Sequence, residues 1–281
     1  MTSHESLRDL LRVPAGPVLL PSYDPGGTPG FDGGKSDGQD ALPAMGEELA
    51  ELQTRLFAHG YTGGKQRILL VLQGMDTSGK GGVVKHCVGL FDPNGVRIAS
   101  FKTPTAEELE HDFLWRVEKV VPEAGQIGIF DRSHYEDVLI ARVHGLADAA
   151  EIERRYDAIN AFEQGLVDAG TRVVKCLLHI SAEEQKQRLL ARLDDPTKQW
   201  KYKPDDVDER LLWTEYQRAV EIALERCNTD AAPWHVVPSD RKWFRNWAVG
   251  QLLLETLREM DLDWPPADYD RDTEKARLAA L

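Results

Sequence analysis

Cysteine is scarce in this sequence, in which Cys87, Cys176 and Cys227 are the only three. They show neither the spacing of a metal site nor the pairing of a disulfide framework. This argues against a thiolate-bound metal and against a small disulfide-stapled scaffold. We therefore expect three reduced thiols in the core, which favours a cytoplasmic protein.

Long apolar runs and an excess of positive charge are missing as well. No segment approaches the roughly 20 apolar residues of a membrane-spanning helix, and the residues MTSHESLRDLLRVPAG lack the parts of a secretory signal. The formal net charge of −13 argues against a nucleic-acid binder with a broad basic surface. We expect neither a membrane nor a nucleic acid as partner. If the protein binds phosphates, its basic groups must be concentrated in one place.

Short apolar runs, each typical of a strand buried on both faces, alternate with helical patterns. The runs lie at 68–72, 96–99, 127–130, 173–178 and 235–237. The helical segments lie at about 80–91, 105–121, 134–143, 149–169, 181–193, 205–227 and 241–259. This alternation predicts an α/β three-layer sandwich around a central five-stranded parallel sheet.

The N-terminal part predicts an arm and one helix. Residues 15–42 are rich in Gly, Pro, Asp and Ser and favour an irregular arm. A helical pattern then runs from Pro43 to near Gly60. No linker divides the rest of the chain, so we expect residues 1–65 to pack on one core domain at 66–281.

The first predicted strand runs into a loop with the spacing of a P-loop, Gly74-Met75-Asp76-Thr77-Ser78-Gly79-Lys80. The strand before it and the helix after it are the context that this Walker A motif requires. Such a loop directs backbone N–H groups and a helix N-terminus at phosphate oxygens, and its lysine adds a positive charge. The expected phosphate-binding residues are Gly74, Thr77, Ser78, Gly79, Lys80, Gly81 and Gly82.

One position departs from the usual motif. Gly81 follows Lys80, where most P-loops carry the Ser or Thr that binds magnesium. Asp76, inside the loop, is the candidate replacement, because a carboxylate beside bound phosphates is repelled unless a cation lies between them. The alternative is that Asp76 only caps the following turn.

A second aspartate, Asp131, follows the predicted strand at 127–130, which is the Walker-B position. Ligands of an open parallel sheet bind at the carboxyl ends of its strands, so Asp76 and Asp131 are the expected metal ligands. Arg132 could bridge phosphate oxygens. Ser133 and Glu136 have the spacing of a capping box, so Glu136 either caps a helix or faces the acceptor nucleotide.

The required concentration of positive charge runs from Lys186 to Lys203, against only Asp194 and Asp195, in a predicted lid at about 186–206. The helix breaks at Pro196, which predicts a helical hairpin. A basic hairpin over a P-loop is the lid of small-molecule kinases, where it excludes water and stabilises transferred charge; a solvated basic face is the alternative. The basic residues are Lys186, Arg188, Arg192, Lys198, Lys201 and Lys203, with Lys85 and Arg116 as further candidate contacts.

Three motifs in this order make the chain resemble the family-2 polyphosphate kinases. They are Gly-Met-Asp-Thr-Ser-Gly-Lys-Gly-Gly at 74–82, Asp-Arg-Ser-His-Tyr-Glu-Asp-Val-Leu at 131–139 and Leu-Asp-Asp-Pro-Thr-Lys-Gln-Trp-Lys-Tyr at 193–202. The likeness extends from residues 28–31 to residues 239–243. Tyr-Glu-Asp at 135–137 resembles the class III branch, although Asp131 stands where many members carry Asn.

The resemblance implies a thymidylate-kinase-like P-loop fold and Mg²⁺-dependent transfer between inorganic polyphosphate and nucleotides. Acceptors would be nucleoside mono- and diphosphates, and members are commonly dimers or tetramers. It implies that Asp76 and Asp131 hold Mg²⁺ and that Glu136 belongs to acceptor selection. The phosphoryl contacts would be Lys80, Arg132 and Arg192, and the expected wider substrate contacts are Lys85, Arg116, Glu136, Arg188, Lys198 and Lys201.

Two other interpretations remain open at this point. An ATP-dependent nucleoside monophosphate kinase would use the same P-loop, lid and Walker-B aspartate, but the missing hydroxyl after Lys80 and the very basic lid suit a long polyanion better. A non-catalytic switch or phosphate sensor could also keep the P-loop. The guanine-reading Asn-Lys-x-Asp motif of a GTPase does not occur.

Overall fold

All five predicted strands are present in the structure, a computed structural model that describes residues 6–281. Neighbouring strands pair in parallel, in the order β2-β3-β1-β4-β5. The central strand β1 therefore ends between β3 and β4, where it enters the glycine-rich loop. The strands are β1 (Arg67–Gln73), β2 (Val96–Ser100), β3 (Ile127–Asp131), β4 (Thr171–His179) and β5 (Trp234–Pro238).

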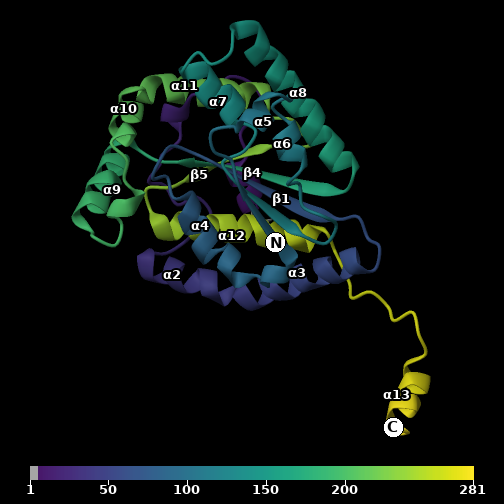
Figure 1. The fold of residues 1–281 in the computed structure, drawn as a ribbon. Coiled ribbons are helices and arrows are strands. Elements are labelled where there is room, and N and C mark those ends of the chain that lie inside the picture. The colour runs from purple at the N-terminus through teal and green to yellow at the C-terminus, as the bar shows by residue number, and fades with distance from the viewer. Residues whose placement is uncertain (1–5) are drawn as a thin grey trace.

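Helices cover both faces of this sheet (Figure 1). One face carries α2 (Lys35–Ala44), α3 (Gly46–Tyr61), α4 (Lys80–His86) and α12 (Lys242–Glu259), and the other carries α7 (Glu136–Val143), α8 (Ala149–Asp168) and α11 (Trp213–Arg226). Successive residues of β1 join two different buried clusters, Leu70 on the α12 side and Leu69 on the α8 side. This two-sided burial explains the continuous apolar runs and confirms the predicted three-layer class.

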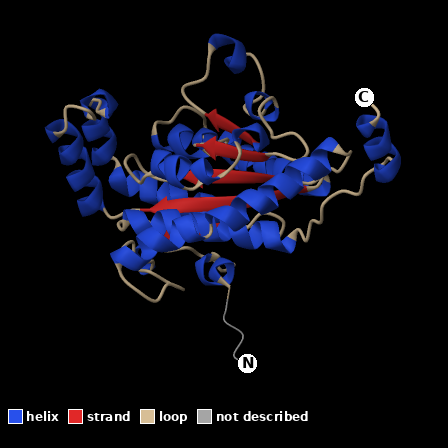
Figure 2. Cartoon of the chain, turned by 90° about the horizontal axis from the view of Figure 1, so that it is seen from below, coloured by secondary structure: helices blue, strands red, loops and turns tan. Residues whose placement is uncertain are grey.

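The segment predicted as a lid at about 186–206 forms part of a helical hairpin, which we call the lid: α9 (Ala182–Asp194) and α10 (Asp205–Leu211), joined through a 3-10 turn at Gln199–Lys201. It lies at the edge toward which the strand arrows point (Figure 2). The lid therefore stands over the carboxyl ends of the strands, where ligands of such sheets bind. The remaining helices are α1 (Leu7–Leu11), α5 (Ala106–Leu109), α6 (Trp115–Glu118) and α13 (Arg271–Ala279). Of the helices within residues 6–281, none is long and apolar enough to cross a membrane.

The predicted irregular arm at 15–42 is wrong at its end, because α2 already begins at Lys35. In the sequence, Gly38 is one of the glycines that favour an irregular segment. In the structure it lies within α2, where a Cβ would be 2.0 Å from the Trp243 ring. Glycine is needed there for close packing of α2 on α12 and does not mark a loop. The boundary between residues 65 and 66 stays a prediction, although Leu49 and Leu56 share a core cluster with Ile68.

Two predicted helices are interrupted. The segment at 105–121 contains only α5 and α6, because the Asp112 side chain accepts a hydrogen bond from the Leu114 N–H and turns the chain between them. The segment at 205–227 divides into α10 and α11 at Leu212, whose backbone angles leave the helical range. Of these two helices, α10 belongs to the lid and α11 packs on the sheet.

Candidate active site

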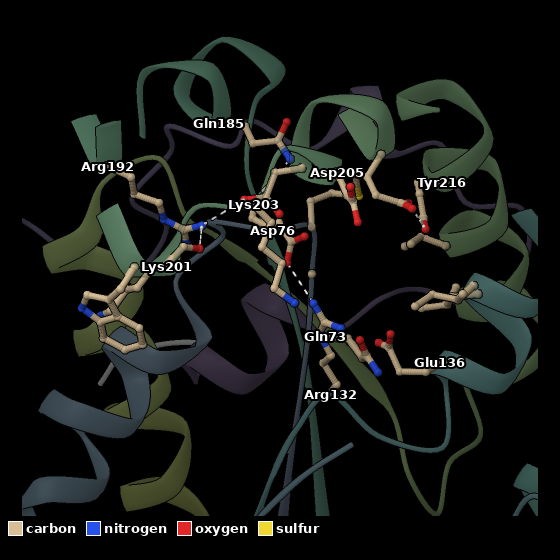
Figure 3. Close-up of a pocket in the computed structure, with 18 residues that line it drawn as sticks. Gln73, Asp76, Arg132, Glu136, Gln185, Arg192, Lys201, Lys203, Asp205 and Tyr216 are labelled. Atoms are coloured by element: carbon tan, nitrogen blue, oxygen red, sulfur yellow. Dashed lines mark hydrogen bonds and ion pairs between the residues drawn. The ribbon is translucent and has the colours of Figure 1, made fainter. Parts of the chain in front are cut away.

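A cleft of about 600 Å³ opens between the end of β1 and the lid (Figure 3). The P-loop contributes Asp76, the turn after β3 contributes Arg132 and Glu136, and α9 contributes Gln185 and Arg192. Figure 3 shows these side chains converging from elements that are far apart in the sequence. The remaining lining residues are Gln73, Gly74, Met75, Leu139, Ile140, Trp200, Lys201, Lys203, Asp205, Asp206, Glu209, Tyr216 and Val220.

The P-loop backbone is held in an unusual conformation. Thr77 has a φ of 64°, which non-glycine residues rarely adopt, and Gly79 has a φ of 109°. Two buried arginines hold the loop through its carbonyl groups. Arg188 of α9 donates to Thr77 O at 2.8 Å, and Arg245 of α12 donates to Ser78 O at 3.0 Å. The loop is thus preorganised, and strain of this kind is typical of ligand-binding backbone.

Lys80 lies in the loop, where its Nζ donates to Gly74 O at 2.7 Å. Burial lowers the pKa of Lys80, whereas the charges of Asp76, Asp131 and Glu136 act in the opposite direction. The hydroxyls of Thr77 and Ser78 are buried and have no hydrogen-bond partner among residues 6–281. Unpaired buried donors cost free energy unless a ligand satisfies them, so they suit an anion in this loop.

Asp76 forms an ion pair with Arg132, whose Nη2 lies 2.9 Å from Asp76 Oδ1. Burial would raise the pKa of Asp76, but the charges of Lys80 and Arg132 outweigh it and the pKa lies below its ordinary value. Asp76 is therefore ionised and faces the cleft, and it forms none of the cap contacts of the alternative interpretation. Arg132 itself has a φ of 65°, a second strained residue in the same site.

The residues present fit a divalent cation bound together with substrate phosphates. No group of three or more His, Cys, Asp or Glu side chains in the described part of the chain could hold a metal alone. One or two carboxylates plus phosphate oxygens are the usual donors for such a small, hard cation, and Asp76 and Asp131 can supply the carboxylates. Asp131 ends β3 directly opposite Leu72 of β1, beside the loop.

Glu136 faces the cleft, and the predicted capping box is absent. The Ser133 hydroxyl accepts from the Tyr135 N–H and from Gln73 Nε2, while α7 begins at Glu136 itself. Burial raises the pKa of Glu136 above its ordinary value of 4.5, against the opposing charges of Arg132 and Lys80. Glu136 is thus placed to interact with a bound substrate.

The predicted basic contacts lie in four different surroundings. Arg192 and Lys201 line the cleft, together with Lys203. Arg188 and Arg116 are instead buried among protein partners: Arg116 donates to Lys102 O and pairs with Asp137 at 2.9 Å. Lys198 pairs with Asp195 at 2.6 Å, outside the cleft lining. Lys85 lines a second cleft on the other side of α4.

Sequence reasoning missed several residues of this site. Arg245 supports the loop from α12, Gln185 donates to Asp76 O at 3.2 Å, and Tyr216 closes the far end of the cleft. Each of these residues reaches the site through packing between segments distant in the sequence, so no local sequence motif indicates its role. Gln73 was missed as well, although its position directly before the P-loop is a local signal that could have indicated it.

Comparison with known proteins decides the family. The profile of "Polyphosphate kinase 2" matches residues 33–265. The chain belongs to the polyphosphate kinase 2 family. It is 44% identical over 252 residues to the AMP/ADP-polyphosphate phosphotransferase of Meiothermus ruber, covering 90% of this chain and 93% of that protein. It is 39% identical over 253 residues to the ADP-polyphosphate phosphotransferase of Rhodopseudomonas palustris, covering 85% and 86%.

The fold is that of a solved member of the polyphosphate kinase 2 family. The crystal structure of polyphosphate kinase 2 from Arthrobacter aurescens TC1 superposes with a TM-score of 0.96 at 55% identity, covering 99% of this chain and 98% of that one. The P-loop kinase architecture predicted from the sequence is thereby confirmed. Phosphoryl transfer of this kind generally needs a divalent cation.

Proposed function

We propose that this chain transfers phosphoryl groups between inorganic polyphosphate and nucleotides, with nucleoside mono- and diphosphates such as AMP and ADP as acceptors. The observation that carries the proposal is the Asp76–Arg132 pair between the P-loop and the end of β3, in a cleft that Arg192, Lys201 and Lys203 line from the lid. The names of the relatives support the polyphosphate donor and the nucleotide acceptor. They do not favour an ATP-dependent kinase or a non-catalytic switch.

Donor dependence tests this function. The purified chain, supplied with AMP, polyphosphate and Mg²⁺ but no ATP, should form ADP and then ATP, which chromatography resolves. The same mixture without polyphosphate is the control. A protein that forms ADP only when ATP is added would contradict the proposal.

Mg²⁺ is the proposed metal, held by Asp76 and Asp131. When bound, it neutralises charge on the phosphate oxygens of both substrates. The protein's own groups do the rest. Backbone N–H groups of Gly74–Gly82 and the Lys80 ammonium bind the donor phosphate, Arg132 orients the acceptor phosphate, and Arg192 and Lys201 close over the transferred group. The terminal P–O–P bond of polyphosphate breaks as a new P–O bond forms to the acceptor phosphate.

The acceptor nucleoside fits the end of the cleft remote from the P-loop. Leu139 and Ile140 of α7 and Val220 of α11 give it apolar walls, and Tyr216 adds a hydroxyl. Glu136 lines the same cleft and begins α7, the helix that carries Leu139 and Ile140, which supports a role in acceptor selection. A nucleoside monophosphate and a diphosphate would place different numbers of charges beside this carboxylate.

Replacing Glu136 by glutamine should remove an acidic limb from the pH profile of the reaction. Because burial raises the pKa of Glu136, its carboxylate gains a proton at a pH above the ordinary 4.5, before Asp76, whose pKa is lowered. The wild-type kcat/KM for AMP should therefore fall as the pH falls toward that pKa, and the Glu136→Gln profile should be flat there. Profiles measured with AMP and with ADP check this, and identical limbs in both proteins would contradict it.

The second cleft supports a path for a long polyanion. It measures about 830 Å³ and is lined by Lys35, Lys85, His86, Arg241 and Lys242, with Glu184 and Asp240 as acidic neighbours. Lys85 lies five residues beyond Lys80 on the same helix, or roughly 7.5 Å along its axis. A donor anchored in the P-loop reaches this cleft only if it extends beyond the bound phosphates.

Replacing Lys85 or Lys242 by alanine should therefore weaken binding of long polyphosphate selectively. We expect the KM of long chains to rise about fivefold per substitution, equivalent to about 1 kcal/mol, and the KM of tripolyphosphate to stay unchanged. Lys65→Ala, an exposed lysine before β1, is the matched control. Equal changes for long and short donors would contradict a path through this cleft.

We also propose a homo-oligomer, a dimer or tetramer. Support comes from the C-terminal segment that carries α13 (Arg271–Ala279), which projects from the body (Figure 1). Its helix α13 has nine residues and buries none of them, and such a short helix is marginal in water on its own. Cover by a second copy would explain its order. Light scattering on the full chain should give a multiple of 31.6 kDa, and a monomer mass would contradict the proposal.

A cytoplasmic location is proposed from the cysteines. Cys87, Cys176 and Cys227 are free and buried. Burial raises the pKa of Cys87 and of Cys227 to about 12, so these thiols are unreactive and suit a reducing compartment.

A further inference from the structure

A lysine lies in the interior of the sheet, at a position where a strand buried on both faces normally carries an apolar residue. Lys175, in the middle of β4, has no exposed surface. Its Nζ donates to Glu163 Oε2 at 2.6 Å, to the Tyr135 hydroxyl at 2.8 Å and to Cys227 O at 2.7 Å. These contacts use all three protons of the ammonium group.

Glu163 of α8 is equally buried and completes the buried hub, defined here as Lys175, Glu163, Tyr135 and His134. Its Oε1 accepts from the Tyr135 hydroxyl at 2.9 Å, and His134 Nε2 lies 3.2 Å away. Burial would raise the pKa of Glu163, but Lys175 and His134 outweigh it and the pKa is lowered. Lys175 and Glu163 thus form a buried ion pair within the hub.

Such a pair is a poor way to gain stability. Removing two charges from water costs several kcal/mol, and a well-packed apolar pair often serves equally well. The hub instead contacts the turn that carries the site. His134 and Tyr135 stand between Arg132 and Glu136, so the two consecutive residues that enter the hub are flanked by two residues that face the cleft.

The other side of this turn is attached to β1. The Arg132 N–H donates to Leu72 O at 3.1 Å, and Gln73 Nε2 donates to Ser133 Oγ at 2.9 Å. The turn is thus fixed from the central strand on one side and from the hub on the other. Between these anchors Arg132 keeps a φ of 65°, a conformation that needs support from its surroundings.

We propose that Lys175 and Glu163 are positioning residues for phosphoryl transfer, which act by holding Arg132 and Glu136 in the cleft through Tyr135 and His134. Neither touches a substrate. The inference rests on the proposed function for its readout. An inactive wild-type protein would contradict that function, whereas an active wild type with unimpaired hub variants would contradict this inference alone.

The double variant Lys175→Met/Glu163→Met tests the proposal, because it removes both buried charges together and leaves neither unpaired. We expect a folded protein whose kcat is about 10- to 100-fold lower, as small misplacements of reacting groups produce. The KM for long polyphosphate should change less than about threefold, since Lys85 and Lys242 lie elsewhere. Glu163→Gln, which keeps the shape of the side chain, should lose less activity.

A second variant and a stability control keep the test decisive. Tyr135→Phe loses one hydroxyl and keeps its ring against Trp234, so it gives the answer should the double variant not fold. Leu56→Ala removes a buried side chain of α3, on the other face of the sheet, and should lower the melting temperature without lowering kcat. A folded double variant or Tyr135→Phe variant with wild-type kcat would overturn the proposal, as would an equal loss in Leu56→Ala.

Discussion

Replacing Asp76 by asparagine is expected to lower kcat about a thousandfold, equivalent to about 4 kcal/mol in the activation free energy. The amide keeps the shape of the side chain but loses the negative charge that pairs with Arg132 and that the cation requires. The concentration of Mg²⁺ that gives half-maximal activity should rise at least about tenfold. Steady-state rates at several Mg²⁺ concentrations measure both effects.

Asp205→Asn is the matched control for this substitution. Asp205 lines the same cleft from the lid but lies away from the P-loop motif, so its kcat should change less than about threefold. If Asp76→Asn keeps wild-type kcat and Mg²⁺ dependence, the proposed metal site is wrong. An equal loss in both variants would point to the general negative charge of the cleft.

Replacing Arg132 by lysine is expected to lower kcat about a hundredfold although the positive charge remains. A guanidinium offers a planar pair of donors to a phosphate, whereas an ammonium is a point charge on a flexible stem. Arg132 has a φ of 65°, which is equally unfavourable for lysine and arginine. The substitution therefore reports on the loss of the guanidinium group and not on a change in backbone strain. Rates with AMP and ADP as acceptors provide the measurement.

Arg192→Lys serves as the comparison, because this lid arginine is bound less tightly, 3.6 Å from Asp206. Its loss should stay below about tenfold. Wild-type activity in Arg132→Lys would mean that charge alone suffices at that position and that the bidentate role is wrong.

The sequence was informative where function depends on neighbours along the chain. The P-loop, Asp131 and the order of strands and helices follow from local patterns, and the structure has all of them. A hairpin was also predicted, because Pro196 breaks a basic helical pattern, but the observed hairpin from α9 to α10 is longer than the predicted 186–206. The family assignment rested on the same local motifs.

Residues that act through tertiary contacts could not be assigned in this way. Arg116 and Arg188 look like candidate phosphate contacts in the sequence, yet Arg116 pairs with Asp137 and Arg188 binds carbonyls of the P-loop and of Ser239. Whether an arginine meets a phosphate or a protein carbonyl depends on packing between distant segments. The same holds for Lys175, whose charge in an apolar strand gives no hint of Glu163.

Transfer of labelled phosphate tests the central claim most directly. The protein is mixed with AMP, Mg²⁺ and polyphosphate labelled with ³²P, without ATP, and the labelled products are separated. We predict label in the β-phosphate of ADP with the wild-type protein and almost none with Asp76→Asn. Label that appears only as inorganic phosphate, or that reaches ADP equally in both proteins, would contradict phosphoryl transfer at the Asp76–Arg132 site.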